Sequence, residues 1–305
     1  MKKIITAAIT GAVHTPGMSP YLPITPDEIV NDAVGAAKAG AAVVHIHARN
    51  PENGEPTSDL SIMREIVTAI KKQSDVIVCI TTGGQIGMSI EERIAAVPDM
   101  KPELASCNAG SLNFVLTPAL KRLKPKYEWE EKFLSGTQDL IFSNTFKGLS
   151  QYVETMYANG TMPEFEVYDV GMINNIAYMM REGVIKAPVY IQFVMGILGG
   201  LPATVRNLNF LVETADMLLG DTFKWSVAAA GKDQFALTTA ALAMGGHVRV
   251  GLEDNLYLEK GVLAKHSSEQ VERIRKALEV LGHEVATPEE ARQILSLKGN
   301  HAVNF

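Results

Sequence analysis

Short apolar runs rich in β-branched residues alternate along the chain with longer amphipathic segments. A strand buried on both faces is apolar throughout, whereas a surface helix shows an apolar stripe at a period of 3.6 residues. The pattern predicts strands at 4–9, 43–49, 75–80, 104–108, 164–168, 189–194, 224–228 and 247–252. Strands that alternate with helices are typical of a parallel sheet, and eight such units within 305 residues predict a (β/α)8 TIM barrel.

Helix start signals support this interpretation. Thr25-Pro26-Asp27-Glu28 predicts a capped helix that runs to about residue 39, and Thr287-Pro288-Glu289-Glu290 predicts a short helix near the end. Ser58 is expected to cap a helix that reaches residue 72. The other helices are predicted near residues 89–95, 148–159, 174–182, 203–219 and 233–243, and from residue 267 or 268 onward.

Residues 111–145 are less regular and form a predicted excursion with a candidate short strand at 140–142. No composition break or linker interrupts the chain, so residues 1–305 are interpreted as a single barrel domain. The alternative is an open doubly wound sheet, but the loop after the first strand lacks the G-x-G-x-x-G of a dinucleotide site.

Composition narrows the choice of partners. The chain is 47% hydrophobic and 20% charged, with a net charge of −6 and no cluster of Lys or Arg. Nucleic acid and membranes are therefore not expected as partners. Cys79 and Cys107 lie in apolar, strand-like segments, where small buried hydrophobes are the expected role. Two cysteines are too few for a disulfide framework, which favours a cytoplasmic protein.

Two histidines stand two residues apart in Val43-Val44-His45-Ile46-His47. Side chains at positions i and i+2 of a strand point to the same face, so His45 and His47 are expected side by side. Neutral imidazole suits zinc and its transition-metal neighbours. A pair on a solvated sheet face is the alternative, but the apolar neighbours favour a buried strand, where imidazoles without a metal would need other partners.

Polar residues crowd the predicted strand ends, where (β/α)8 barrels carry their function. They are His14 after the first strand, Thr81, Gly83 and Gly84 after the third, Ser106 and Asn108 on the fourth, Glu166 on the fifth, and Arg249, Glu253 and Asp254 at the eighth. Glu253 is the best third metal ligand, because the eighth strand closes the barrel beside the first. A His-His-Glu set leaves an open position, and its charge of about +1 with a divalent metal suits an anionic substrate.

Some of these residues also have a simpler explanation. Glu253 is also consistent with a helix cap or an ion pair to Arg249, and Asp254 with a cap of the next segment or an ion pair to Arg249. His14 is, taken alone, consistent with an exposed loop residue.

Short motifs follow the strand ends in a fixed order: Ile9-Thr10-Gly11-Ala12, Leu22-Pro23-Ile24-Thr25-Pro26, His45-Ile46-His47, Thr82-Gly83-Gly84, Asn108-Ala109-Gly110-Ser111-Leu112-Asn113-Phe114, Glu164-Phe165-Glu166-Val167-Tyr168, Ile191-Gln192-Phe193-Val194 and Gly251-Leu252-Glu253-Asp254-Asn255. Together they span nearly the whole chain and resemble the β-keto acid cleavage enzyme family. The resemblance implies a zinc-dependent (β/α)8 barrel, usually a homotetramer. It also implies condensation of a β-keto acid with acetyl-CoA, which gives acetoacetate and a new acyl-CoA.

The resemblance assigns roles to individual residues. They are the zinc ligands His45, His47 and Glu253, the proton-handling pair Asp254 and Arg249, the catalytic hydroxyl of Thr81, and the substrate-site residues His14, Gly83, Gly84, Ser106, Asn108 and Glu166. Two positions depart from the family member of lysine fermentation. Thr81 replaces a serine, and Val13-His14 stands where that member has an acidic residue for a substrate ammonium. A neutral or anionic substrate tail is therefore expected.

Three other functions fit parts of the pattern. A metal-dependent aldolase or lyase uses related enolate chemistry but needs no acetyl-CoA. A zinc hydrolase of the TIM-barrel type carries H-x-H on its first strand and further histidines on strands five and six, and those strands have none here. A non-catalytic binding barrel would bind the metal without turnover.

Overall fold

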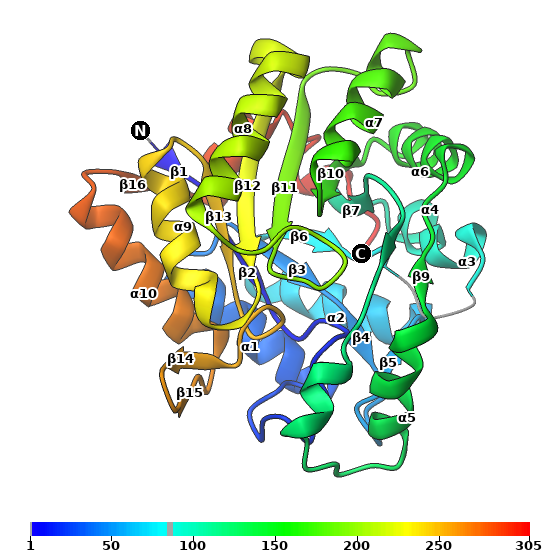
Figure 1. Cartoon of the computed structure of the whole chain (residues 1–305), viewed down its shortest axis with the longest axis vertical. Coiled ribbons are helices and arrows are strands. Elements are labelled where there is room, and N and C mark those ends of the chain that lie inside the picture. The colour runs from blue at the N-terminus through cyan, green and yellow to red at the C-terminus, as the bar shows by residue number, and fades with distance from the viewer. Residues whose placement is uncertain (1, 84–87) are drawn as a thin grey trace.

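Eight parallel strands form a closed barrel at the centre of the molecule. The computed structural model describes residues 2–83 and 88–305. Within these residues the barrel order is β10-β11-β12-β13-β2-β3-β6-β7 (Figure 1). The strands are β2 (Ile5–Ala8), β3 (Val43–Ile46), β6 (Ile77–Ile80), β7 (Leu104–Asn108), β10 (Met162–Val167), β11 (Val189–Met195), β12 (Phe223–Ala229) and β13 (His247–Val250). The predicted (β/α)8 barrel is confirmed, and the open doubly wound sheet is wrong.

Helices pack around the outside of the barrel (Figure 1). They are α1 (Pro26–Ala39), α2 (Leu60–Gln73), α3 (Ile90–Ile94), α4 (Ala96–Met100), α6 (Phe146–Ala158), α7 (Val170–Arg181), α8 (Val205–Leu219), α9 (Gln234–Ala243), α10 (Ser267–Val280) and α11 (Pro288–Leu295). The capping box predicted for α1 is confirmed, because Thr25 and Glu28 each accept a hydrogen bond from the other's backbone N–H. No helix in the described part of the chain is long and apolar enough to cross a membrane.

Alternate residues of each strand lie on opposite sides of the barrel wall. In β3, Val44 and Ile46 belong to the apolar core between barrel and helices, whereas Val43 belongs to a smaller core inside the barrel. The strand is therefore buried on both faces, as predicted, and His45 continues the inner face. β3 ends at Ile46, so His47 follows the strand instead of lying within it as predicted.

Small two-stranded sheets lie outside the barrel. They are β1 (Lys2–Lys3) with β16 (Glu284–Val285), β4 (Ala48–Arg49) with β5 (Pro56–Thr57), β8 (Leu112–Asn113) with β9 (Ile141–Phe142), and the hairpin β14 (Tyr257–Glu259) with β15 (Val262–Leu263). The strand predicted at 140–142 is confirmed as β9, which closes the excursion 111–145 against β8.

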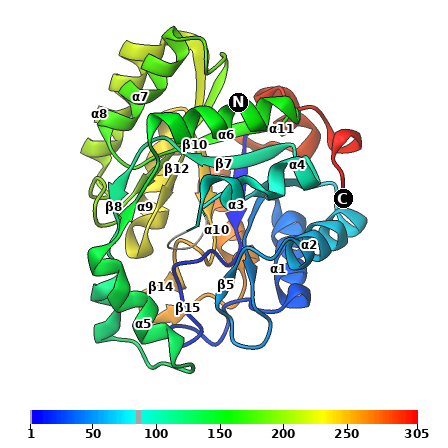
Figure 2. The ribbon, with the colours of Figure 1, turned by 90° about the vertical axis from the view of Figure 1, so that its right-hand side faces the viewer.

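The excursion also contains the helix α5 (Trp129–Gly136), which was not predicted. Glu130 on this helix is fully buried and accepts hydrogen bonds from the backbone N–H groups of Gly17, Lys126 and Tyr127. The excursion is thereby tied to the loop that follows β2. Figure 2 shows α5 on the same side of the molecule as β14 and β15, away from both chain ends.

Some helix boundaries differ from the prediction. α2 is capped by Asp59 rather than by Ser58, because the Asp59 carboxylate accepts a hydrogen bond of 2.8 Å from the backbone N–H of Ser61. α7, predicted from residue 174, begins at Val170. The helix predicted at 89–95 ends one residue early as α3, and the short helix α4 follows it.

Candidate active site

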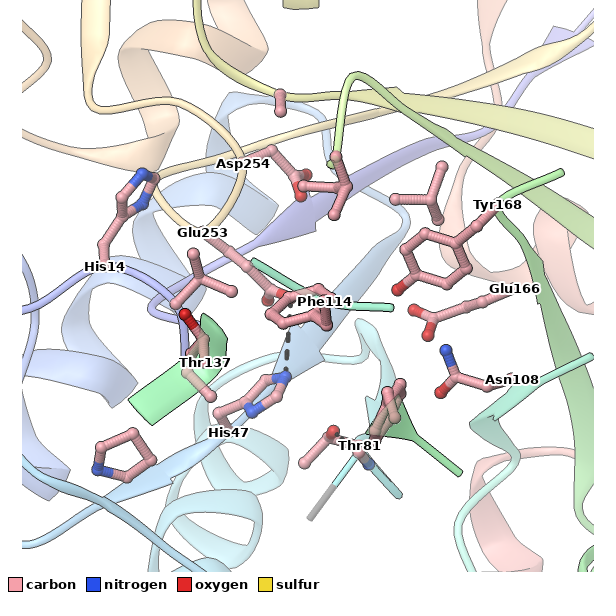
Figure 3. Close-up of a pocket in the computed structure, with 18 of the residues that line it drawn as sticks. His14, His47, Thr81, Asn108, Phe114, Thr137, Glu166, Tyr168, Glu253 and Asp254 are labelled. Atoms are coloured by element: carbon pink, nitrogen blue, oxygen red, sulfur yellow. Dashed lines mark hydrogen bonds and ion pairs between the residues drawn. The ribbon is translucent and has the colours of Figure 1, made fainter. Parts of the chain in front are cut away.

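A cavity of about 440 Å³ opens at the C-terminal ends of the barrel strands. Its inner wall is polar, and His47, Thr81, Glu166, Glu253 and Asp254 all point into it (Figure 3). These side chains come from strands that are far apart in the sequence. The cavity therefore lies where the function of a (β/α)8 barrel is expected.

Three predicted metal ligands converge at the bottom of the cavity. His45 Nε2 lies 3.1 Å from His47 Nε2, and the Glu253 carboxylate oxygens lie 3.8 Å from His45 Nε2 and 3.5 Å from His47 Nε2. Glu253 Oε2 is buried and has no hydrogen-bond partner among the described residues. Two imidazole nitrogens beside a buried, unpartnered carboxylate oxygen fit a zinc-type ion with an open coordination position.

The protonation states of these groups suit a cation. Burial lowers the pKa of His45 to about 3, so its imidazole is neutral at neutral pH. Burial opposes the ionisation of Glu253, but Arg249 and the two histidines outweigh this effect and hold its pKa well below the ordinary value. The site therefore offers a neutral imidazole and an ionised carboxylate, which are the forms that bind metals.

A second set of candidate ligands shares His45 and lies deeper in the barrel. Cys79 Sγ is 3.5 Å from His45 Nδ1 and 3.7 Å from Glu164 Oε1. Burial raises the pKa of the Cys79 thiol well above its ordinary value, and metals bind the thiolate rather than the thiol. This difference favours the set of His45, His47 and Glu253. Cys79 is buried as predicted, but it contacts two polar groups and is not simply a hydrophobe.

Arg249 connects the third ligand to the predicted base. Its Nε and Nη2 donate to the Asp254 carboxylate at 2.8 and 2.9 Å, and Nη2 also donates to Glu253 Oε1 at 2.7 Å. Its Nη1 donates to Gln192 Oε1 at 2.9 Å, a contact that sequence reasoning missed although Gln192 lies in a recognised motif. Burial raises the pKa of Asp254, while Arg249 opposes the rise. A buried carboxylate fixed by a guanidinium is suited to act as a general base.

Glu166, Asn108 and Tyr168 lie together on one side of the cavity (Figure 3), and Glu166 Oε1 lies 3.5 Å from Arg249 Nη1. Glu166 and Asn108 are paired positions of the neighbouring strands β10 and β7. Burial raises the pKa of Glu166 to about 8, so the carboxyl group is largely protonated at neutral pH. A protonated carboxyl donates a hydrogen bond, which suits an oxygen of the substrate. Tyr168 was not predicted as a site residue, although it ends a recognised motif.

The end of β6 supplies a hydroxyl to the cavity. Thr81 lines the cavity, and its Oγ1 accepts a hydrogen bond of 3.0 Å from the Gly83 N–H. Gly83, a predicted substrate-site residue, also lines the cavity, but this bond occupies its N–H group. Ser106 is buried beneath and pairs with Thr82 through both its hydroxyl and its carbonyl oxygen, so it does not reach the cavity wall. Gly84 lies outside the described residues.

The loop after β2 brings His14 to the cavity. His14 Nδ1 lies 2.9 Å from the carbonyl oxygen of Leu252, which can only accept, so Nδ1 carries the hydrogen. Burial lowers the pKa of His14 to about 4, which leaves Nε2 as a neutral acceptor. The fully buried Arg49 holds the loop by donating to the carbonyl oxygens of His14 and Thr10.

Gly11 allows this loop to approach the third metal ligand. Its φ is +59°, and a Cβ built there would lie 2.3 Å from Glu253 Cγ. Any other residue would displace Glu253. The glycine in the Ile9-Thr10-Gly11-Ala12 motif therefore serves the site sterically.

The outer wall of the cavity is apolar and comes from the excursion. The side chains are those of Phe114, Phe133, Leu140, Ile141 and Phe142. Arg93 attaches this wall to the barrel, because it donates to the carbonyl oxygens of Thr82 and Ser143 and lies 4.8 Å above the Phe142 ring. Neither this aromatic wall nor Arg93 was predicted.

The fold and the site define a (β/α)8-barrel enzyme whose polar groups gather around a candidate metal position. A family model described as "beta-keto acid cleavage enzyme" matches residues 2–297. The chain belongs to the β-keto acid cleavage enzyme family, as its motifs predicted.

Named relatives are similar along their whole length. The chain is 45% identical over 305 residues to the 3,5-dioxohexanoate:acetyl-CoA acetone transferase of Paraburkholderia graminis, covering 100% of this chain and 98% of that protein. It is 39% identical over 298 residues to the 3-keto-5-aminohexanoate cleavage enzyme of Fusobacterium nucleatum, covering 97% of this chain and 98% of that protein.

The apo structure of ObcA is similar in fold, with a TM-score of 0.73 and 22% identity, over 92% of this chain and 66% of that chain. The barrel assignment is thus supported independently of the sequence motifs.

Proposed function

We propose that the protein exchanges acyl groups between a β-keto acid and acetyl-CoA, and that zinc bound by His45, His47 and Glu253 assists the reaction. The products are acetoacetate and a new acyl-CoA. One observation carries the proposal: the unpartnered Glu253 Oε2 lies beside two imidazoles, and Arg249 joins this carboxylate to Asp254. The membership of the chain in the β-keto acid cleavage enzyme family supports it.

The first task of the residues is to move a proton. Bound zinc would act as a Lewis acid toward the oxygens of the keto acid. Asp254 takes a proton from C2 of the β-keto acid, and Arg249 keeps the carboxylate oriented through two hydrogen bonds of 2.8 and 2.9 Å. The resulting carbanionic C2 then attacks the thioester carbonyl of acetyl-CoA, and the CoA thiolate leaves.

The second task is to exchange the acyl group. The released CoA thiolate attacks the original keto carbon, and the bond between this carbon and C2 breaks. The acyl group leaves as a new CoA thioester, and Asp254 returns its proton to C2 of the acetoacetate. Atoms and charges balance, because one acyl group has replaced another on both CoA and C2.

Two donors are placed to stabilise the oxyanions of these additions. The Thr81 oxygen already accepts from Gly83, so its own hydrogen is free to turn toward the cavity. The protonated Glu166, whose Oε1 lies 3.5 Å from Arg249 Nη1, offers a second hydrogen. One well-placed oxyanion donor typically contributes about 3 kcal/mol to a reaction of this kind.

The tail of the substrate is neutral in this proposal. The side chains of the outer wall are aromatic and aliphatic apart from Arg93, and His14, which also lines the cavity, is neutral. An ammonium tail would lack a carboxylate partner there, and burying an unpaired charge is costly. The similarity to a 3,5-dioxohexanoate transferase points to a tail that carries an uncharged oxygen.

A panel of β-keto acids with acetyl-CoA tests the proposal, with acetoacetate release as the readout. We expect turnover with neutral tails such as that of 3,5-dioxohexanoate, and at least tenfold lower kcat/KM with ammonium tails. Cleavage that proceeds without acetyl-CoA would indicate an aldolase or lyase instead. A zinc-loaded protein that releases acetoacetate from no member of the panel would contradict the proposed reaction.

We further propose a homo-oligomer, as the family resemblance implies a tetramer. Three exposed apolar side chains on α8 support this proposal: Val205, Phe210 and Met217, of which Met217 is the most exposed at 76%. Phe210 and Met217 are two helical turns apart and share one face of the helix, and contiguous exposed apolar side chains of this kind mark a contact surface. Light scattering of the purified protein should give a mass near four times 33.0 kDa.

A further inference from the structure

Cys79 occupies a position inside the barrel that the proposed reaction does not use. It lies on β6 directly opposite His45 of β3 in the strand register. Its Sγ lies between His45 Nδ1, at 3.5 Å, and Glu164 Oε1, at 3.7 Å. His45, Cys79 and Glu164 have exposed fractions of 1%, 0% and 0%, so bulk water does not provide alternative partners. The three groups form a continuous polar chain through the barrel interior.

The direction of this chain follows from the imidazole. His45 Nε2 faces His47 and Glu253, so metal binding requires a lone pair on Nε2 and a hydrogen on Nδ1. A buried N–H group needs an acceptor. Within residues 2–83 and 88–305, Cys79 Sγ is the acceptor within hydrogen-bond distance of Nδ1. The sulfur therefore accepts from His45.

Among the described residues, the hydrogen of the thiol has one polar acceptor in reach. The thiol offers a single donor, and Glu164 Oε1 is the oxygen in reach of Sγ. The chain therefore runs from Nδ1–H to the sulfur and from S–H to the carboxyl oxygen. Histidine ligands commonly donate their second N–H to a carboxylate or carbonyl, which fixes the tautomer and the ring orientation. Here a thiol stands between the imidazole and the carboxyl group.

We propose that Cys79 and Glu164 are positioning residues that hold His45 in the tautomer with Nε2 free and thereby set the affinity of the site for zinc. This inference rests on the proposed zinc site. Cys79 acts directly on the imidazole, and Glu164 acts through Cys79 by fixing the direction of the S–H bond. Loss of Cys79 should therefore have the larger effect.

The experiment measures the zinc dissociation constant of the metal-stripped full-length protein by competition with a chromophoric chelator. Cys79→Ala removes the acceptor, and we expect zinc to bind 10- to 100-fold more weakly, as for other partners of metal-ligating histidines. Cys79→Ser restores an O–H group that accepts and donates, so affinity should return to within about threefold of the wild type. Glu164→Met removes only the last acceptor, and we expect a loss of about threefold to tenfold.

Cys107→Ala is the matched control. Cys107 is equally buried, on the neighbouring strand β7, but it belongs to the apolar core outside the barrel. The control should bind zinc as the wild type does. Urea unfolding of each metal-free variant reports any general loss of stability, and the rescue by serine separates positioning from packing. If Cys79→Ala fails to fold, the comparison of Cys79→Ser with Glu164→Met decides the matter.

The outcomes are distinct. If folded Cys79→Ala binds zinc as tightly as the wild type, the inference is overturned while the zinc site stays intact. If Cys79→Ala does not fold, wild-type zinc affinity in Glu164→Met would overturn the inference in the same way. A serine variant as weak as the alanine variant would also overturn it. A wild-type protein that binds no zinc would overturn the proposed metal, and this inference with it.

Discussion

The substitution Asp254→Asn tests the proposed base with little change in shape. The Asp254 carboxylate accepts two hydrogen bonds from Arg249, at 2.8 and 2.9 Å, and an asparagine oxygen can keep one of them. Arg249 retains Glu253 at 2.7 Å and Gln192 at 2.9 Å, so its charge stays paired. We therefore expect a loss of only about 1–3 kcal/mol in the free energy of unfolding.

The effect on catalysis should be much larger. A positioned general base typically contributes about 10²- to 10⁴-fold to the rate. At 1.36 kcal/mol for each factor of ten, this corresponds to about 3–5 kcal/mol in activation free energy. Because Asp254 acts on the reacting carbon and does not bind zinc in our proposal, kcat should fall by this factor while zinc content stays unchanged.

The assay is acetoacetate release at saturating β-keto acid and acetyl-CoA, with zinc content measured on the same sample. In the wild type, activity should fall at acid pH as Asp254 becomes protonated, and burial raises the pKa of that carboxyl above its usual 3.8. The residual activity of Asp254→Asn should lack this acid limb. A variant that keeps kcat within threefold of the wild type with full zinc would refute the role of Asp254 as base.

Stripping zinc with a chelator should abolish acetoacetate release, and added zinc should restore it; activity that survives in verified metal-free protein would contradict the metal site. Glu166→Gln should flatten the pH dependence of stability in metal-free protein. Burial raises the pKa of Glu166 from 4.5 to about 8, so between these values the native state holds a proton that the unfolded chain releases. As pH rises through this window, the wild type should thus lose up to about 1.4 kcal/mol of unfolding free energy per pH unit relative to the variant. Unfolding free energies from urea denaturation that change with pH by the same amount in both proteins would disprove the shift. Arg49→Lys loses the planar guanidinium that holds the His14 loop. We therefore expect a free energy of unfolding about 2 kcal/mol lower and a raised KM for the keto acid. An unchanged KM would show that the loop does not depend on Arg49.

The barrel was predictable because its signal is repeated and local. Each strand is a short apolar run. In β3 this run is apolar throughout because its side chains pack into a core inside the barrel and a core outside it. The helix α5 was missed because its position depends on distant contacts. Buried Glu130 accepts from Gly17, a residue 113 positions away, and in the sequence it is one charged residue among several.

The candidate site was predictable where function follows from position at a strand end. His45, Glu253 and Asp254 meet because β2 lies between β3 and β13 in the barrel, as the closed order requires. Gln192 was missed because its role depends on reaching Arg249 across 57 positions of sequence. Cys79 was missed for a similar reason, since only the register of β3 with β6 places its thiol on the imidazole.

The charge balance of the inner wall explains why a barrel with so many carboxyl groups would accept an anionic keto acid. Burial raises the pKa of Glu164 to about 7 and that of Glu166 to about 8, so both lose much of their charge at neutral pH. The single positive charge of Arg249 then balances one of the two negative charges of Glu253 and Asp254, which leaves one excess negative charge. A divalent ion would turn this into one excess positive charge, which matches the carboxylate of a β-keto acid. If Glu164 and Glu166 were both ionised, the same ion would leave the wall negative and the substrate would be repelled. In the proposed mechanism, burial of these two carboxyl groups therefore favours the binding of an anionic keto acid.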